Sequence, residues 1–131
     1  MRTLCAAFLA ALVLAAGCAT TFEFRRQELL AERVRQYGKL IRWSEFEGAQ
    51  LYLTEEAPGR RTPPPKGIRV TDYEVKQLIL TAGGLHAGQV VQISYFNQKE
   101  ARVRTLEDVQ QWVFDPEQNE WFLKSGLPDF K

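Results

Sequence analysis

The side chains of this chain that could act as an acid or a base are few and lie apart in the sequence. His86 is the only histidine and stands in the glycine-rich stretch 83–88. Imidazole is the commonest general base near neutral pH, but it acts on a neighbouring nucleophile or with a second polar group. Since no serine or cysteine is close to it in the sequence, we interpret His86 as a surface or hydrogen-bonded residue of a loop.

Carboxylates are the other candidates for acid–base chemistry. Asp72 precedes Tyr73 near the start of an expected strand, where apolar surroundings would raise the pKa of the carboxyl group and make it a base. Glu107 and Asp108 fall within another expected strand, at what we interpret as an exposed kink. A single carboxylate without a second polar group beside it does not make an acid–base mechanism. We therefore assign no catalytic residue and favour a non-enzymatic role.

Composition excludes further classes of function. One histidine and scattered carboxylates provide few suitable ligands for zinc or iron, so we expect no metal and no cofactor. Apart from Arg2, the chain has 16 basic and 16 acidic residues. Nucleic-acid binding requires clustered positive charge, and we do not expect it here.

The first 17 residues have the layout of a signal peptide. Arg2 supplies a positive charge, and the apolar run from Leu4 to Gly17 carries none. This run is shorter than the roughly 20 apolar residues of a membrane-crossing helix. We therefore expect residues 1–17 to be removed and residues 18–131 to form a single domain, in keeping with a length of 131 residues.

The stretch Leu14-Ala15-Ala16-Gly17-Cys18 resembles the lipobox of bacterial lipoproteins. The resemblance implies cleavage before Cys18 and attachment of lipid to its sulfur, with two or three acyl chains such as palmitate forming a stable anchor. Ala19, rather than an aspartate, follows the cysteine, which implies the periplasmic face of the outer membrane. The alternative is a plain secretory peptide, which would leave Cys18 as an unpaired thiol in an oxidising compartment.

An amphipathic helix is expected directly after the anchor. Thr20-Thr21-Phe22-Glu23 is typical of a capping box, and Gly38 would mark a bend or an end, so we predict a helix over 20–37. Spacings of four, three and four residues define an apolar stripe, formed by Leu30, Val34, Tyr37 and Ile41. We interpret the basic residues outside this stripe as a solvated face close to lipid headgroups: Arg25, Arg26, Arg33 and Arg35.

A second helix and an irregular connector are expected next. Ser44-Glu45-Phe46-Glu47 is typical of another capping box and predicts a helix over 44–53 with Phe46, Ala49 and Leu53 buried. Prolines and glycines then dominate residues 57–67, which predicts a mobile loop without helix or strand. Its basic residues leave open a second interpretation, a docking loop for an anionic partner.

The rest of the chain alternates apolar and polar residues and predicts strands over 68–80, 89–97, 101–114 and 120–125, with residues 81–88 joining the first two. In the first strand, Tyr73, Val75 and Ile79 are expected on one face. Polar turn sequences between the later segments predict an antiparallel meander.

Element order and aromatic pattern together resemble small bacterial lipoproteins with an NTF2-like, cystatin-related α+β fold, over residues 22–130. The resemblance rests on Leu40-Ile41-Arg42-Trp43, Asp72-Tyr73-Glu74-Val75, Gln111-Trp112-Val113-Phe114, Glu120-Trp121-Phe122-Leu123 and Leu127-Pro128-Asp129-Phe130. It implies N-terminal helices packed on a curved antiparallel sheet of about four strands. Such folds host enzymes, ligand binders and interaction modules, so the resemblance does not name the activity.

Large aromatic side chains are the candidates for a pocket or an interface, because they line binding sites as well as cores. They are Trp43, Tyr73, Tyr95, Trp112 and Trp121. Our leading hypothesis is a non-enzymatic, periplasm-facing lipoprotein module that binds a protein or an envelope component, and that could pair with a second copy through an exposed sheet face. The alternatives are a carrier or sensor of a small apolar ligand and, less favoured, an isomerase or hydrolase.

Overall fold

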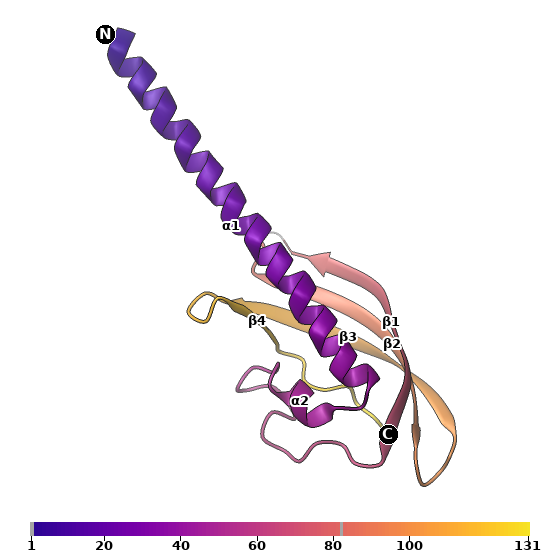
Figure 1. Ribbon diagram of the computed structural model, residues 1–131. Coiled ribbons are helices and arrows are strands. Elements are labelled where there is room, and N and C mark those ends of the chain that lie inside the picture. Colours follow the sequence, from indigo (N-terminus) through magenta and orange to yellow (C-terminus); the bar gives the residue numbers. More distant parts are fainter. Residues whose placement is uncertain (1, 82) are drawn as a thin grey trace.

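The computed structural model describes the backbone of residues 2–81 and 83–131, and the side chains from Thr20 onward except that of residue 82. The side chain of Cys18 thus lies outside the described residues. The elements are α1 (Arg2–Arg42), α2 (Phe46–Gln50), β1 (Ile68–Leu80), β2 (His86–Asn97), β3 (Val103–Asp115) and β4 (Glu120–Leu123). The strands form one antiparallel sheet in the order β1-β2-β3-β4 (Figure 1). The α+β class and the four-stranded meander are confirmed.

The long helix α1 crosses one face of the sheet and extends far beyond it at its N-terminal end (Figure 1). Its expected stripe packs on the sheet, since Leu30, Tyr37 and Ile41 are buried. The predicted bounds of 20–37 were wrong, because the helix continues upstream to Arg2 and Gly38 does not end it. A Cβ atom at Gly38 would lie 2.9 Å from Cε1 of Tyr73, so this glycine lets α1 pass close to β1. Within the described part of the chain, no helix is long and apolar enough to span a membrane.

The basic face of α1 is less solvated than expected. Arg33 packs its guanidinium 3.9 Å from the centre of the Tyr52 ring and donates a hydrogen bond to the backbone oxygen of Trp121 at 2.9 Å. Arg26 places its guanidinium 5.9 Å from the centre of the Phe114 ring. Both side chains join α1 to the end of the sheet, because their long stems pack on apolar surface while the charge finds polar partners.

The prediction of a second capping box, at residues 44–47, was wrong. Glu45 is the N-cap of the short helix α2 and makes no side-chain capping bond. Ser44 instead adopts a left-handed backbone conformation, with φ 61°, and its Oγ accepts a hydrogen bond from the amide of Val70 at 2.9 Å. The predicted burial of Phe46, Ala49 and Leu53 is confirmed. The turn after α1 is therefore fixed by the first residues of β1 and not by a helix cap.

Residues 57–67 contain neither helix nor strand, as predicted. The side-chain nitrogen of Gln50 donates to the backbone oxygens of Gly59 and Thr62, each at 2.8 Å. Arg60 and Arg61 both pair with Glu55, and their hydrogen bonds lower the pKa of that carboxyl group. The docking-loop interpretation is not tested by these contacts, because one carboxylate serves two guanidinium groups and Lys66 is also exposed.

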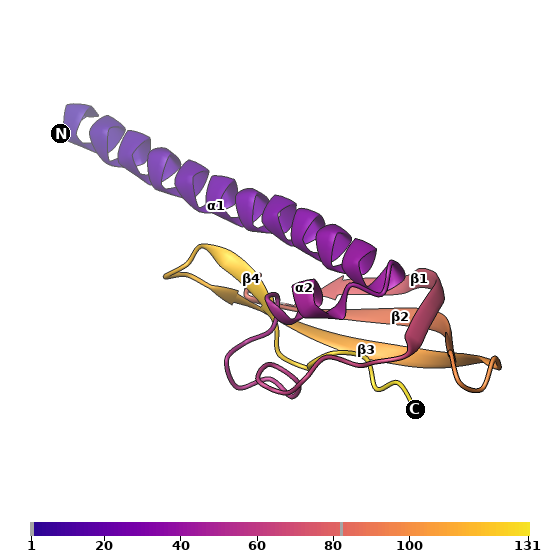
Figure 2. The ribbon, with the colours of Figure 1, turned by 60° about the horizontal axis from the view of Figure 1, so that its bottom comes forward.

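The core lies between α1 and one face of the sheet, and both helices lie on that side (Figure 2). Tyr37 meets Trp112 edge to face, with ring centres 5.4 Å apart. The other face, which we call the open face, exposes Ile79, Val103 and Val109. The bounds of β1 match the prediction, whereas β2 begins three residues early because His86 pairs with Val113 and continues the ladder.

Candidate binding groove between α1 and β1

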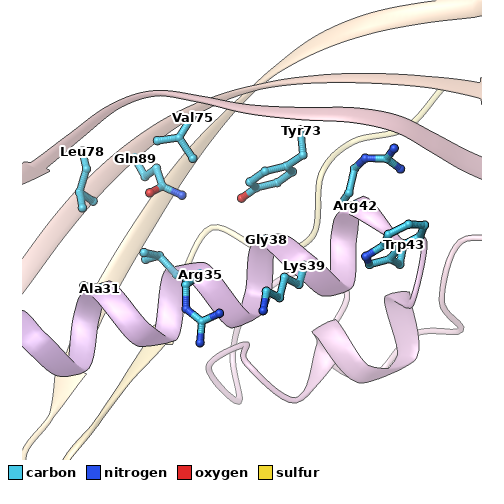
Figure 3. A pocket seen from close by; sticks show the side chains of 11 residues that line it. Ala31, Arg35, Gly38, Lys39, Arg42, Trp43, Tyr73, Val75, Leu78 and Gln89 are labelled. Carbon is cyan, nitrogen blue, oxygen red and sulfur yellow. The ribbon is translucent and has the colours of Figure 1, made fainter.

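A groove of about 500 Å³ runs between α1 and the edge strand β1 (Figure 3). We call it the α1/β1 groove. Apolar side chains form most of its walls, and several are well exposed: Trp43 by 66%, Val75 by 51% and Leu78 by 44%. The full lining consists of Ala31, Val34, Arg35, Gly38, Lys39, Arg42, Trp43, Tyr73, Val75, Leu78 and Gln89. Contiguous exposed apolar side chains of this kind typically mark a binding surface.

The strand side of the groove depends on a β-bulge. The pairing of β1 with β2 shifts between Val75 and Gln77, so that Val75 pairs with Val91 and Leu78 pairs with Gln89. Both partners are buried on the helix side of the sheet. Side chains three residues apart therefore share one face, because the extra residue of a bulge reverses the alternation. The expectation that Ile79 would share a face with Tyr73 and Val75 was wrong, since the bulge places Leu78 on that face instead.

Cations border the groove. Three of its lining residues are basic, namely Arg35, Lys39 and Arg42, and none is acidic. Arg42 is held in place, because it donates to the backbone oxygen of Val70 at 3.2 Å and its guanidinium lies 5.1 Å from the centre of the Trp43 ring. Arg35 pairs with Glu32 at 2.6 Å. The groove thus combines apolar walls with a positively charged border.

A buried hydrogen-bond network lies behind the groove, with the fully buried side chain of Gln110 at its centre. The amide nitrogen of Gln110 donates to the hydroxyl of Tyr73 at 3.0 Å and to Oδ2 of Asp108 at 2.9 Å. Its oxygen accepts from Nε2 of Gln89 at 3.0 Å and from Nε1 of Trp112 at 3.1 Å. Gln110 therefore uses both its donors and accepts twice, as a buried amide must if desolvation is to be offset.

Two groups of this network have shifted pKa values. Burial raises the pKa of Tyr73 to about 12, so the hydroxyl stays protonated at neutral pH. Burial also raises the pKa of Asp108, against the opposing effect of the hydrogen bond from Gln110. The expectation that Asp108 lies at an exposed kink was wrong, because its side chain is half-buried on the same side of β3 as Gln110. Glu107 is exposed.

The two groups lie on either side of the Gln110 amide nitrogen, which bonds to both. Tyr73 lines the α1/β1 groove, whereas Asp108 lines a separate depression beside the C-terminal segment. Burial also raises the pKa of Tyr37 well above the ordinary value, and among the described residues the buried Tyr37 hydroxyl has no hydrogen-bond partner. An acid–base pair would need a reacting atom between the two groups, and the amide nitrogen of Gln110, which bonds to both, occupies that position.

The residues expected to be functional are divided by the structure. Trp43 and Tyr73 line the groove. Tyr95, Trp112 and Trp121 are buried in the core. Two of the acid–base candidates, His86 and Asp72, are exposed. In the described part of the chain, no three His, Cys, Asp or Glu side chains are close enough to hold a metal ion.

Sequence reasoning named two of the eleven lining residues, Trp43 and Tyr73, as pocket candidates and missed the other nine, among them Lys39, Arg42 and Leu78. For the two basic residues, a signal was present. Lys39 and Arg42 lie three residues apart near the end of α1, hence on one side of the helix, and next to Trp43. For Leu78, the regular alternation of the strand predicted a position on the opposite face of the sheet from Tyr73 and Val75.

No protein-family model matches this chain, and no curated protein matches it.

Proposed function

We propose that this chain is a non-enzymatic, lipid-anchored module facing the periplasm, which binds a protein or another envelope component in the α1/β1 groove. The single observation that carries the proposal is the groove itself, which exposes Trp43 at one end and Val75 and Leu78 toward the other and is bordered by cations. The position of the Gln110 amide between Tyr73 and Asp108 supports a binding role over an acid–base enzyme.

The lipid anchor is supported by the sequence before Cys18 and by the first exposed residues after it. Phe22 and Phe24 are exposed by 69% and 63%, four and six residues beyond Cys18. Aromatic side chains are enriched at the membrane–water interface. Ala31, the first groove residue, lies 13 residues after Cys18, about 20 Å along a helix. An acylated Cys18 would thus hold the groove near a bilayer of the outer membrane, our proposed location.

The NTF2-like relation is part of the same proposal. It is supported by the order of elements, a long helix followed by a four-stranded meander, and by the packing of Trp112 and Trp121 between helix and sheet. Pairing of two copies through the open face is the weaker partner proposal. Polar residues separate the apolar residues of the open face. Val109, for example, has Glu107 and Gln111 as its neighbours on that face of β3.

A photo-crosslinking amino acid placed in cells at Leu78 or Ile79 tests this function. The two positions are adjacent and similarly exposed, but only Leu78 lines the groove. We expect adducts with a protein or a lipid from position 78, lost when Ala31→Trp fills the groove, and few from position 79. Equal adduct formation at both positions, unaffected by Ala31→Trp, would refute the groove as the binding surface.

A further inference from the structure

We propose that the ligand of the α1/β1 groove is a single acyl chain that carries an anionic head group. This inference rests on the proposed function and makes it more specific, since it names the envelope component as a lipid. It depends on three features of the groove: its shape and walls, its occupied polar groups, and the position of its cations.

The shape and walls of the groove suit an elongated apolar chain. From Ala31 to Arg42, where α1 ends, the groove follows twelve residues of the helix, about 17 Å. Its volume of about 500 Å³ is within the usual range for ligand pockets. Opposite the helix, Val75 and Leu78 project toward α1 and supply the second apolar wall (Figure 3). An acyl chain laid along it would cover side chains that are now exposed.

The uncharged polar side chains of the groove are few and partly engaged. The hydroxyl of Tyr73 accepts a hydrogen bond from Gln110, and the amide nitrogen of Gln89 donates one to Gln110. The Tyr73 hydroxyl proton and the Gln89 side-chain oxygen are the uncharged side-chain groups left to bond a ligand there. A ligand rich in polar groups would lose its hydration there without replacement, which is costly, whereas an acyl chain loses nothing.

The cations give the groove a direction. Arg42 lies beside Trp43 at one end of the lining, and Lys39 lies one helical turn before it. The opposite end, at Ala31, Val34 and Leu78, is apolar apart from Arg35, whose charge is paired with Glu32. Because no acidic residue lines the groove, an anionic head placed near Lys39 and Arg42 meets only complementary charge.

An added peptide strand is a poorer occupant. Its main chain would need a regular row of partners along the free edge of β1, but that strand is interrupted by register shifts between Val70 and Asp72 and between Val75 and Gln77. Lys76 lies at the second shift and is exposed. Bulges and lysines on an edge strand are known obstacles to strand addition. A chain without hydrogen-bonding groups has no such requirement.

The test uses the full-length lipid-anchored protein in phosphatidylcholine vesicles with a 16-carbon fatty acid that carries a diazirine near its methyl end. After illumination, adducts are mapped by mass spectrometry. We expect them on the groove residues Ala31, Val34 and Leu78. Leu78→Glu should reduce labelling about tenfold or more, since it puts a carboxylate among apolar walls, and Ile79→Glu should not. Ala31→Trp, at an exposed helix position, should block labelling by filling the groove.

The head group is tested with the uncharged 16-carbon alcohol bearing the same diazirine. Lys39→Glu should reduce labelling by the acid several-fold and leave labelling by the alcohol unchanged. Labelling spread equally over the groove and the open face, or unchanged by both Leu78→Glu and Ala31→Trp, overturns the inference. Protein adducts in cells from position 78, without fatty-acid labelling in vesicles, would overturn the lipid ligand and leave the proposed function standing.

Discussion

Trp112→Ala should lower the free energy of unfolding by about 3–5 kcal/mol, the largest stability effect expected in the domain. The indole is fully buried, meets Tyr37 edge to face, and donates from Nε1 to the oxygen of Gln110. Its removal leaves a cavity beneath α1 and takes one donor from a buried amide. Since domains are stable by about 5–15 kcal/mol, this loss removes a large share of the total. Urea unfolding followed by circular dichroism measures it.

Trp43→Ala is the matched control, because the same side chain is removed from a site that is 66% exposed. We expect a change within about 0.5 kcal/mol, as for most surface substitutions. If the alanine variant at position 112 fails to fold, Trp112→Phe should give a smaller and measurable loss. Equal effects at positions 43 and 112 would contradict the described core.

Cys18→Ser should abolish lipid attachment and release the protein from the membrane, or leave an uncleaved precursor. A serine hydroxyl cannot form the thioether through which the resemblance implies that lipid is attached, and without acyl chains the remaining domain has no stable anchor. Labelling with a radioactive or alkyne-bearing palmitate, followed by separation of membrane and soluble fractions, measures both effects. We expect lipid incorporation to fall to background.

Cys5→Ser is the control for this experiment, because it removes the other cysteine of the chain from within the expected leader. It should preserve lipid labelling and membrane association. Mature, membrane-bound and lipid-labelled protein in the Cys18→Ser variant would refute the anchor at this position.

Local periodicity predicted the elements whose burial follows directly from sequence spacing. The stripe at Leu30, Tyr37 and Ile41 is buried because residues three and four apart share one side of a helix. The bounds of β1 were predicted because glycine and proline precede it and a glycine pair follows. Trp43 and Tyr73 were among the candidate pocket residues and both line the groove.

The rest depends on contacts between residues distant in sequence. Ser44 is typical of a helix cap, but it bonds to Val70, 26 residues further on. The bulge between Val75 and Gln77 reverses the alternation of β1, and nothing in the local sequence announces it. Asp108 has the spacing of Gln110 and Trp112 and so faces the core, although its charge indicated an exposed kink. That interpretation gave more weight to the charge of Asp108 than to its position in the alternation of the strand. The position was the better guide.

The central claim, that the α1/β1 groove is the binding surface in the envelope, is tested most directly by carbene footprinting of the lipid-anchored protein in its native membrane and after purification. The account predicts that Trp43 and Leu78 are labelled several-fold less in the native membrane, whereas Ile79 and Val109 on the open face are labelled equally in both. Equal labelling of Trp43 and Leu78 in the two states, or protection confined to Ile79 and Val109, would contradict it, and the second result would favour pairing through the open face.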